Sequence, residues 1–111
     1  MTAADILSRL GLTANYKGFS YIVSAVELCL EDRDRLHLVT KQVYPEVARR
    51  HGTNWRAVER DIRKAGELIW AQGRDMLENL ARRPLRKKPG NAQFLAILTL
   101  AVKRSGPKRK I

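Results

Sequence analysis

Apolar residues recur along most of this chain at intervals of three and four positions, which is the spacing of one face of an α-helix. The chain has no sustained alternation of apolar and polar residues, and it has no Asn-Gly or Asp-Gly pair of the kind that closes a β-hairpin. The pattern therefore predicts an all-α fold, a compact bundle of about six helices.

Before Tyr44 the pattern predicts three helices. Thr2 is expected to cap a short helix that ends at Gly11, because glycine readily adopts the backbone conformation that stops a helix. The segment 18–32 is apolar over a wide arc, so it is expected to be the central helix of the core. A third helix is expected over about residues 35–43.

The next residues predict a helix-turn-helix. Proline opens a short helix over 45–51, where its missing N–H costs nothing, and Gly52 can make the turn. A long amphipathic helix follows over about 54–72, and Val58 is expected to pack back against the short helix. The usual motif has an apolar residue where this chain has Asp61, so the pattern alone leaves DNA binding undecided.

The side chains of the 54–72 helix divide into two sides when they are placed at 100° per residue. The apolar side consists of Trp55, Val58, Ile62, Ala65 and Ile69. The opposite side is mostly cationic and consists of Arg56, Arg60, Arg63, Lys64 and Glu67, with Glu59 on the flank. Because the apolar side should face the core, Trp55 and Trp70 are expected to be core residues rather than platforms for stacked bases.

The rest of the chain predicts two more helices and two basic segments. Asp75 is expected to cap a short helix after a stop at Gly73, and Asn91 is expected to cap a last apolar helix. Between them, 82–90 contains prolines, a glycine and no acid, and is expected to be a loop. We expect one helix-turn-helix domain over 1–104 and a disordered basic tail over 105–111.

Charge narrows the choice of partner, since 22 Lys and Arg residues exceed 11 Asp and Glu residues and give a net charge of +11. Such an excess favours a polyanion, either nucleic acid or an acidic membrane surface. No segment is apolar for long enough to cross a membrane, and the N-terminal residues do not form a secretory signal. One cysteine, Cys29, cannot form an internal disulfide, so an intracellular protein with a buried thiol is expected.

Catalytic and metal-binding patterns are missing from the sequence. His37 and His51 have no Cys, His or carboxylate partners at the spacing of a metal site, and the glycines stand singly at helix ends. No set of nucleophile, base and acid stands out. We therefore expect a protein that is not an enzyme and that needs no cofactor or metal.

Several blocks resemble the C-terminal DNA-binding domain of the stage zero sporulation response regulator, a family of bacterial transcription factors. They lie in the same order from about Leu10 to the last helix and are 17-KGF-19 with Tyr21, 44-YPEVARR-50, 58-VERDIRKA-65, Trp70 and 88-KPGNAQF-94. The resemblance implies a six-helix protein that binds short boxes of double-stranded DNA, often as head-to-tail pairs. It also implies contact with RNA polymerase and its sigma factor, in the cytoplasm and on the nucleoid.

The resemblance also implies roles for single residues. Glu59 and Arg60 match the pair that faces bases in the family, while Arg63 and Lys64 match neighbours that hold phosphates. An arginine can donate two hydrogen bonds to guanine, and a glutamate can accept one from cytosine. Arg56, near the start of the helix, is also placed for a groove or phosphate contact.

A second set of phosphate contacts is expected from the basic loop, because it flanks the motif and has no acid. Its cations are Arg82, Arg83, Arg86, Lys87 and Lys88. Solvent exposure alone would also explain such a run. If the loop holds phosphates, affinity should fall steeply as the salt concentration rises.

Two departures from the family limit what can be transferred. Full-length members have an N-terminal receiver domain with a phosphoacceptor aspartate, whereas this chain begins almost at the first helix, so that control is not expected here. Met1 slightly favours a natural single-domain relative over an isolated piece. The stretch between Gly73 and Lys88 is shorter and more basic than in the family.

Two other functions remain compatible with the sequence. One is a protein-interaction module of the same fold that engages RNA polymerase or a regulator and does not bind DNA. The other is a non-specific nucleic-acid binder that depends on the loop and the tail. Glu59 argues against the second, because a purely electrostatic binder gains nothing from a carboxylate near DNA.

Overall fold

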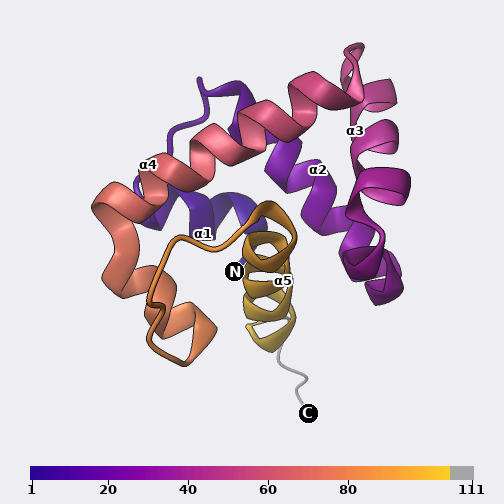
Figure 1. Cartoon of the computed structure of the whole chain (residues 1–111). Coiled ribbons are helices and arrows are strands. Elements are labelled where there is room, and N and C mark those ends of the chain that lie inside the picture. Colours follow the sequence, from indigo (N-terminus) through magenta and orange to yellow (C-terminus); the bar gives the residue numbers. More distant parts are fainter. Residues whose placement is uncertain (106–111) are drawn as a thin grey trace.

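The fold is described from a computed structural model, which places residues 1–105 (Figure 1). Its elements, in chain order, are α1 (Ala3–Arg9), α2 (Lys17–Glu31), the 3₁₀-helix η1 (Arg33–His37), the π-helix η2 (Val39–Val43), α3 (Tyr44–His51), α4 (Trp55–Ala81) and α5 (Asn91–Arg104). No strand occurs within residues 1–105. The all-α prediction is confirmed, with five α-helices in place of about six.

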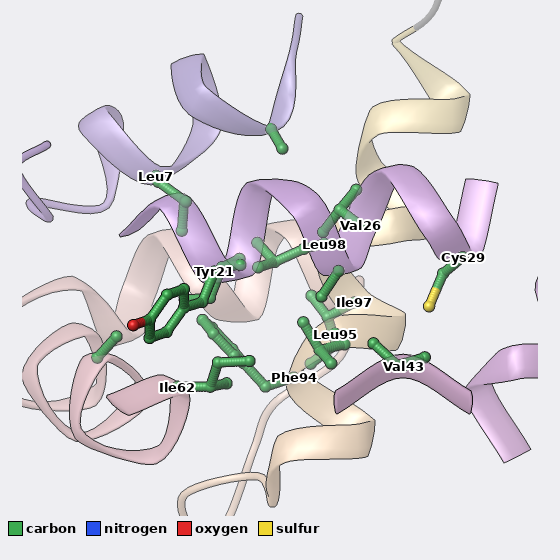
Figure 2. Packing of buried hydrophobic residues seen from close by; sticks show 14 of the residues in the cluster. Leu7, Tyr21, Val26, Cys29, Val43, Ile62, Phe94, Leu95, Ile97 and Leu98 are labelled. Carbon is green, nitrogen blue, oxygen red and sulfur yellow. The ribbon is translucent and has the colours of Figure 1, made fainter. Parts of the chain in front are cut away.

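The core is organised around α2, which packs against α1, α3, α4 and α5 (Figure 1). Figure 2 shows side chains of α1, α2, η2, α4 and α5 converging there, among them Leu7, Val26, Val43, Ile62 and Phe94. All of these side chains are buried. The wide apolar arc of α2 is thus covered on several sides, as a central helix requires.

The first helix follows the local rules closely. Thr2 accepts a hydrogen bond from the Asp5 N–H at 3.1 Å, and the Asp5 carboxylate accepts one from the Thr2 N–H at 3.0 Å. This reciprocal capping box satisfies backbone donors that a helix start leaves free. Gly11 follows the helix with φ of 97°, so the predicted cap and stop are both confirmed.

The α-helix predicted over 35–43 is wrong, because η1 and η2 occupy this stretch. Leu38, with φ of −135° and ψ of 42°, interrupts the helical path between them. The inward positions are nevertheless kept, since Val39 and Val43 are buried. Arg35 donates to the Leu28 carbonyl at 2.7 Å, which gives the end of α2 a cationic partner.

Two predicted helices after Gly52 are one helix, α4, with a kink at Gly73. Gly73 has φ of −127° and ψ of 25°, and a Cβ there would lie 2.8 Å from the Leu10 carbonyl oxygen. The glycine therefore bends the helix around α1 and does not end it. Arg82, in the left-handed conformation with φ of 60°, ends α4.

The segment 82–90 contains no helix, as predicted, and Leu85 ties its middle to α4. Buried Leu85 donates its N–H to Glu78 at 2.7 Å, and its carbonyl accepts from Arg74 at 2.7 Å. The predicted cap of the last helix is wrong, because Gly90 is the N-cap and Asn91 is the first helical residue. The predicted tail lies outside the described residues from 106 onward.

Candidate DNA-binding surface

The helix-turn-helix consists of α3, a tight turn at Gly52 and the first half of α4. Gly52 has φ of 65°, a left-handed conformation that glycine adopts without a Cβ clash. The Thr53 N–H donates to the Ala48 carbonyl at 2.9 Å, which closes the end of α3. Asn54 caps α4 by accepting from the Ala57 N–H at 2.9 Å.

The first half of α4 has the two sides that its sequence predicts. The buried side consists of Val58, Ile62, Ala65 and Ile69. The outward side exposes Arg56, Arg60, Arg63 and Lys64 and half-exposes Glu59. We call this outward set the recognition face. It brings together all the predicted contact residues that lie on this helix.

Trp55 is not a core residue, so that prediction is wrong. Its side chain is 41% exposed, and the Arg56 guanidinium lies 5.4 Å from the centre of its ring. Helical side chains lean toward the N-terminus, so a residue in the first position points past the end of the helix and away from the core. Trp70, further along α4, is half-buried against the core, as predicted.

Ion pairs hold three of the charged side chains of the recognition face: Glu59, Arg60 and Arg63. Arg63 Nη1 lies 2.8 and 2.7 Å from the two carboxylate oxygens of Glu59, one helical turn away. Arg60 Nε lies 3.3 Å from Asp61 Oδ1. The side chains of Arg63 and Glu59 are 45% and 34% exposed, so water still reaches the pair. Such surface pairs are weak and can rearrange when a ligand arrives.

A single amide side chain joins the recognition helix to its neighbours. Asn91 Nδ2, at the start of α5, donates to the Tyr44 hydroxyl and to the Glu59 carbonyl, each at 3.0 Å. Tyr44 is buried at the start of α3, and burial raises the pKa of its phenol. The amide thus ties α3 and α4 to α5 beneath the recognition face. The sequence pattern predicts only a cap for Asn91, although the residue lies within a block that carries the family resemblance.

The cations of the basic loop do not form a single group in the structure. The end of the loop adjoins the recognition helix, since Pro89 is buried and Asn91 reaches Glu59. Arg86, Lys87 and Lys88 precede this contact. Arg82 instead borders a hollow at the far end of α5 that Arg104 also lines, and Arg83 borders a second hollow that follows α5 from Gln93 to Arg104. The structure therefore separates the predicted loop contacts into two groups.

Other chemistry finds little support in residues 1–105. Burial raises the pKa of the Cys29 thiol to about 11, which leaves it protonated and unreactive at neutral pH. His51 contacts Ser24 at 2.8 Å and the edge of the Tyr21 ring. No group of three or more His, Cys, Asp or Glu side chains in this part of the chain is arranged to hold a metal ion. None of the described helices is long and apolar enough to span a membrane.

Comparison with protein families agrees with this geometry. A family model described as "Sporulation initiation factor Spo0A C terminal" matches residues 3–102, which covers every α-helix of the fold except the last two residues of α5. The family is one of DNA-binding regulators of sporulation and not of enzymes. The chain therefore belongs to the Spo0A C-terminal family, whose domains bind DNA and regulate transcription in sporulation.

Proposed function

We propose that this protein binds double-stranded DNA sequence-specifically, with the first half of α4 in the major groove, and regulates transcription. One observation supports the proposal above all others. The helix that follows the Gly52 turn buries its apolar side and turns a face of four cations and one carboxylate outward. A helix in this position of a helix-turn-helix is the element that enters the groove.

Base reading is assigned to Arg60 and Glu59. Arg60 is exposed, and a guanidinium donates in bidentate geometry to guanine O6 and N7. The Glu59 carboxylate can accept from cytosine N4. Because acceptor and donor are adjacent on one face, the pair can distinguish bases rather than only attract phosphates.

The ion pairs of the free protein do not prevent this readout. Pairs at this helical spacing contribute about 0.3–0.5 kcal/mol, whereas a good bidentate contact to a base is worth about 1–3 kcal/mol of discrimination. The second quantity is larger, so DNA can open or share the Glu59–Arg63 pair.

Phosphate contacts are assigned to the cations around the base-reading pair. These are Arg56, Arg63 and Lys64 on α4, with Arg86, Lys87 and Lys88 from the near end of the loop. Charge-assisted contacts of this kind add affinity and fix the orientation of the protein, with little sequence information. The predicted contacts of Arg82 and Arg83 with the same duplex stay predictions, and their distance from the recognition face disfavours them.

The finer partners belong to the same proposal. Head-to-tail pairing on tandem boxes, contact with RNA polymerase and sigma factor, and location on the bacterial nucleoid are supported by family membership alone. No residue of this chain is assigned to the pairing or to the contact with RNA polymerase. The length of the footprint on a selected site would test the pairing. Transcription with purified RNA polymerase would test the contact with polymerase and sigma factor.

The decisive experiment is selection of bound sequences from a random duplex pool, first with the unchanged chain and then with Arg60→Ala. An enriched motif is expected from the unchanged chain. The variant should lose preference at one base pair of that motif, by roughly 5- to 150-fold, which corresponds to the energy of one bidentate contact. Full specificity in the variant would contradict the assignment of Arg60, and absence of any motif would contradict the proposed function.

Arg63→Ala should act differently, because its assigned contact is with a phosphate. The variant should weaken binding to all sequences alike and lower the slope of log K against log salt by about 0.9. Arg33→Ala is the matched control, since this exposed arginine lies on η1, outside the recognition face. A change of base preference in Arg63→Ala would instead place this residue among the base readers.

A further inference from the structure

A second group of cations gathers where α4 and α5 end. Arg104, the last residue of α5, donates to the Leu80 carbonyl at 2.6 Å. It lines a hollow of about 240 Å³ with Arg82 and another of about 90 Å³ with Arg83. Lys103 is exposed on the same last turn. We call Arg82, Arg83, Lys103 and Arg104 the α5-end cluster.

Carboxylates do not offset this charge. Neither hollow has an Asp or Glu in its lining. Within residues 1–105, none of the four cations forms an ion pair, whereas six other arginines do: Arg35, Arg49, Arg50, Arg60, Arg63 and Arg74. The electrostatic potential at the cluster is therefore positive throughout, and such a surface attracts a polyanion.

The backbone at Arg82 gives an independent indication. Among residues 1–105, Arg82 is the only residue other than glycine with a positive φ. This position ends a helix in the left-handed conformation, where glycine is usual because a Cβ makes the conformation strained. An exposed arginine is therefore held where glycine would relieve strain, which points to a use for its charge.

Distance separates the cluster from the recognition face. Asn91 at the start of α5 contacts the Glu59 carbonyl, and Arg104 at its end contacts the Leu80 carbonyl. A helix of 14 residues is about 20 Å long, so the two contacts are that far apart. Figure 1 shows α5 running from beneath α4 toward the opposite side of the molecule. This separation is about twice the Debye length of 8–10 Å at moderate salt, so the cluster contributes little to the attraction of a duplex on the recognition face.

We infer that the α5-end cluster is a second phosphate-binding surface, which takes a separate DNA segment while the recognition face holds its site. One molecule would then bridge two segments. The chemistry fits a phosphate backbone, because guanidinium groups match phosphate oxygens in bidentate geometry and no carboxylate is present to select a base. The bridging part rests on the proposed function, whereas phosphate binding by the cluster does not.

A two-duplex capture assay tests the inference. A biotinylated duplex with the selected site is fixed on beads, the full chain is added, and capture of a second, fluorescent duplex of unrelated sequence is measured. The intact protein should capture the second duplex, and capture should fall as salt rises. The double variant Arg82→Gly, Arg83→Gln should capture at least about tenfold less of the fluorescent duplex. Its affinity for the fixed duplex should be unchanged. Glycine suits the backbone at position 82, so the variant is expected to fold.

The matched control removes the same charge elsewhere. Arg33→Gln, Lys41→Gln changes two exposed cations on η1 and η2 and should leave capture unchanged. Equal capture by the cluster variant and the intact protein would overturn the inference, as would loss of capture when only Lys108, Arg109 and Lys110 are changed to Gln. Failure of the intact protein to capture a second duplex would also overturn it and would leave an acidic protein as the alternative occupant.

A separate measurement distinguishes the inference from the proposed function. The variant Arg60→Ala, Arg63→Ala should still bind the unrelated duplex, because the cluster remains, and adding Arg82→Gly, Arg83→Gln should weaken that binding further, by about tenfold. If the intact protein selects no motif, the proposed function fails while this comparison still tests the cluster. If a motif is selected and this comparison shows no difference, the inference fails alone.

Discussion

The recognition face and the α5-end cluster are both basic, but their charges are held in different ways. On the recognition face, Arg63 is paired with Glu59 and Arg60 with Asp61. In the cluster, no carboxylate from residues 1–105 lines the hollows beside Arg82, Arg83 and Arg104. Alternating signs can match the donors and acceptors of particular bases, whereas one sign can match only the phosphate backbone. The difference teaches that net charge alone cannot tell which basic surface reads sequence.

The two surfaces also differ in how firmly the surrounding structure fixes their position. The recognition face lies on a helix that α2 approaches closely at Gly18 and that Asn91 ties down at Glu59. The cluster lies at the last residues of two helices and on the loop that follows one of them. Base reading needs side chains placed to within a fraction of an ångström, and phosphate binding tolerates more movement. Substitutions that disturb the contacts of Gly18 and Asn91 with α4 should therefore affect the recognition face more than the cluster.

The largest effect is expected from Gly18→Ala. A Cβ at Gly18 would lie 2.5 Å from the Asp61 backbone oxygen, so α4 would have to move away from α2. We expect the free energy of unfolding to fall by about 3 kcal/mol, the upper part of the range for overpacking. Urea denaturation measures this change, and DNA binding by the folded fraction should lose specificity before it loses non-specific affinity.

Gly66→Ala is the control for that substitution. Gly66 lies in the same helix, α4, but a Cβ there would meet nothing within 4 Å. Alanine should therefore raise the free energy of unfolding by up to about 1 kcal/mol, because it is the better helix former. Equal destabilisation by the two substitutions would contradict the close approach of α2 and α4 at Gly18.

A smaller effect is expected from Asn91→Ala. The change leaves the buried Tyr44 hydroxyl without its partner and releases the Glu59 carbonyl, so the free energy of unfolding should fall by about 1–2 kcal/mol. Affinity for the selected site should fall as well, while capture of a second duplex persists. Tyr44→Phe keeps the link between Asn91 and Glu59 and should cost less. Unchanged site affinity in Asn91→Ala would show that this link does not position the recognition helix.

The smallest effect is expected from Arg82→Gly, and its sign is opposite. Glycine removes the left-handed strain at φ of 60°, so the free energy of unfolding should rise by about 0.5–1 kcal/mol. Arg83→Gly is the control, because Arg83 has no positive φ and glycine should bring no gain there. Thermal denaturation of the two variants side by side measures the difference. No gain at Arg82 would remove the argument from strain, although not the argument from charge.

Local signals in the sequence predicted much of the fold. The cap at Thr2, the stop at Gly11 and the turn at Gly52 depend on residues close together in the chain, and all three are confirmed. The apolar side of α4 was also predicted, because periodicity reports which residues can be buried together. For the same reason the fold class and the cationic side of the recognition helix followed from the sequence.

Three predictions of local structure were wrong. Gly73 looked like a helix stop, but its conformation depends on the nearby Leu10 carbonyl, which is distant in sequence. Asn91 looked like a cap, but its amide bonds two other helices. Residues 35–43 had helical spacing, yet the chain kept the same residues inward with two shorter turns. At Gly73 and Asn91 a tertiary contact outweighed a local preference.

The sequence by itself determined the all-α class, the helix-turn-helix and the cationic side of α4, because these depend on periodicity, caps and turns within a few residues. Only the tertiary structure decided which charges are neighbours. It placed the Asn91 amide against the Glu59 carbonyl and brought Arg82 beside Arg104 at the far end of α5. The reason is that charge and hydrogen-bond networks depend on distances between helices, and packing of the core sets those distances.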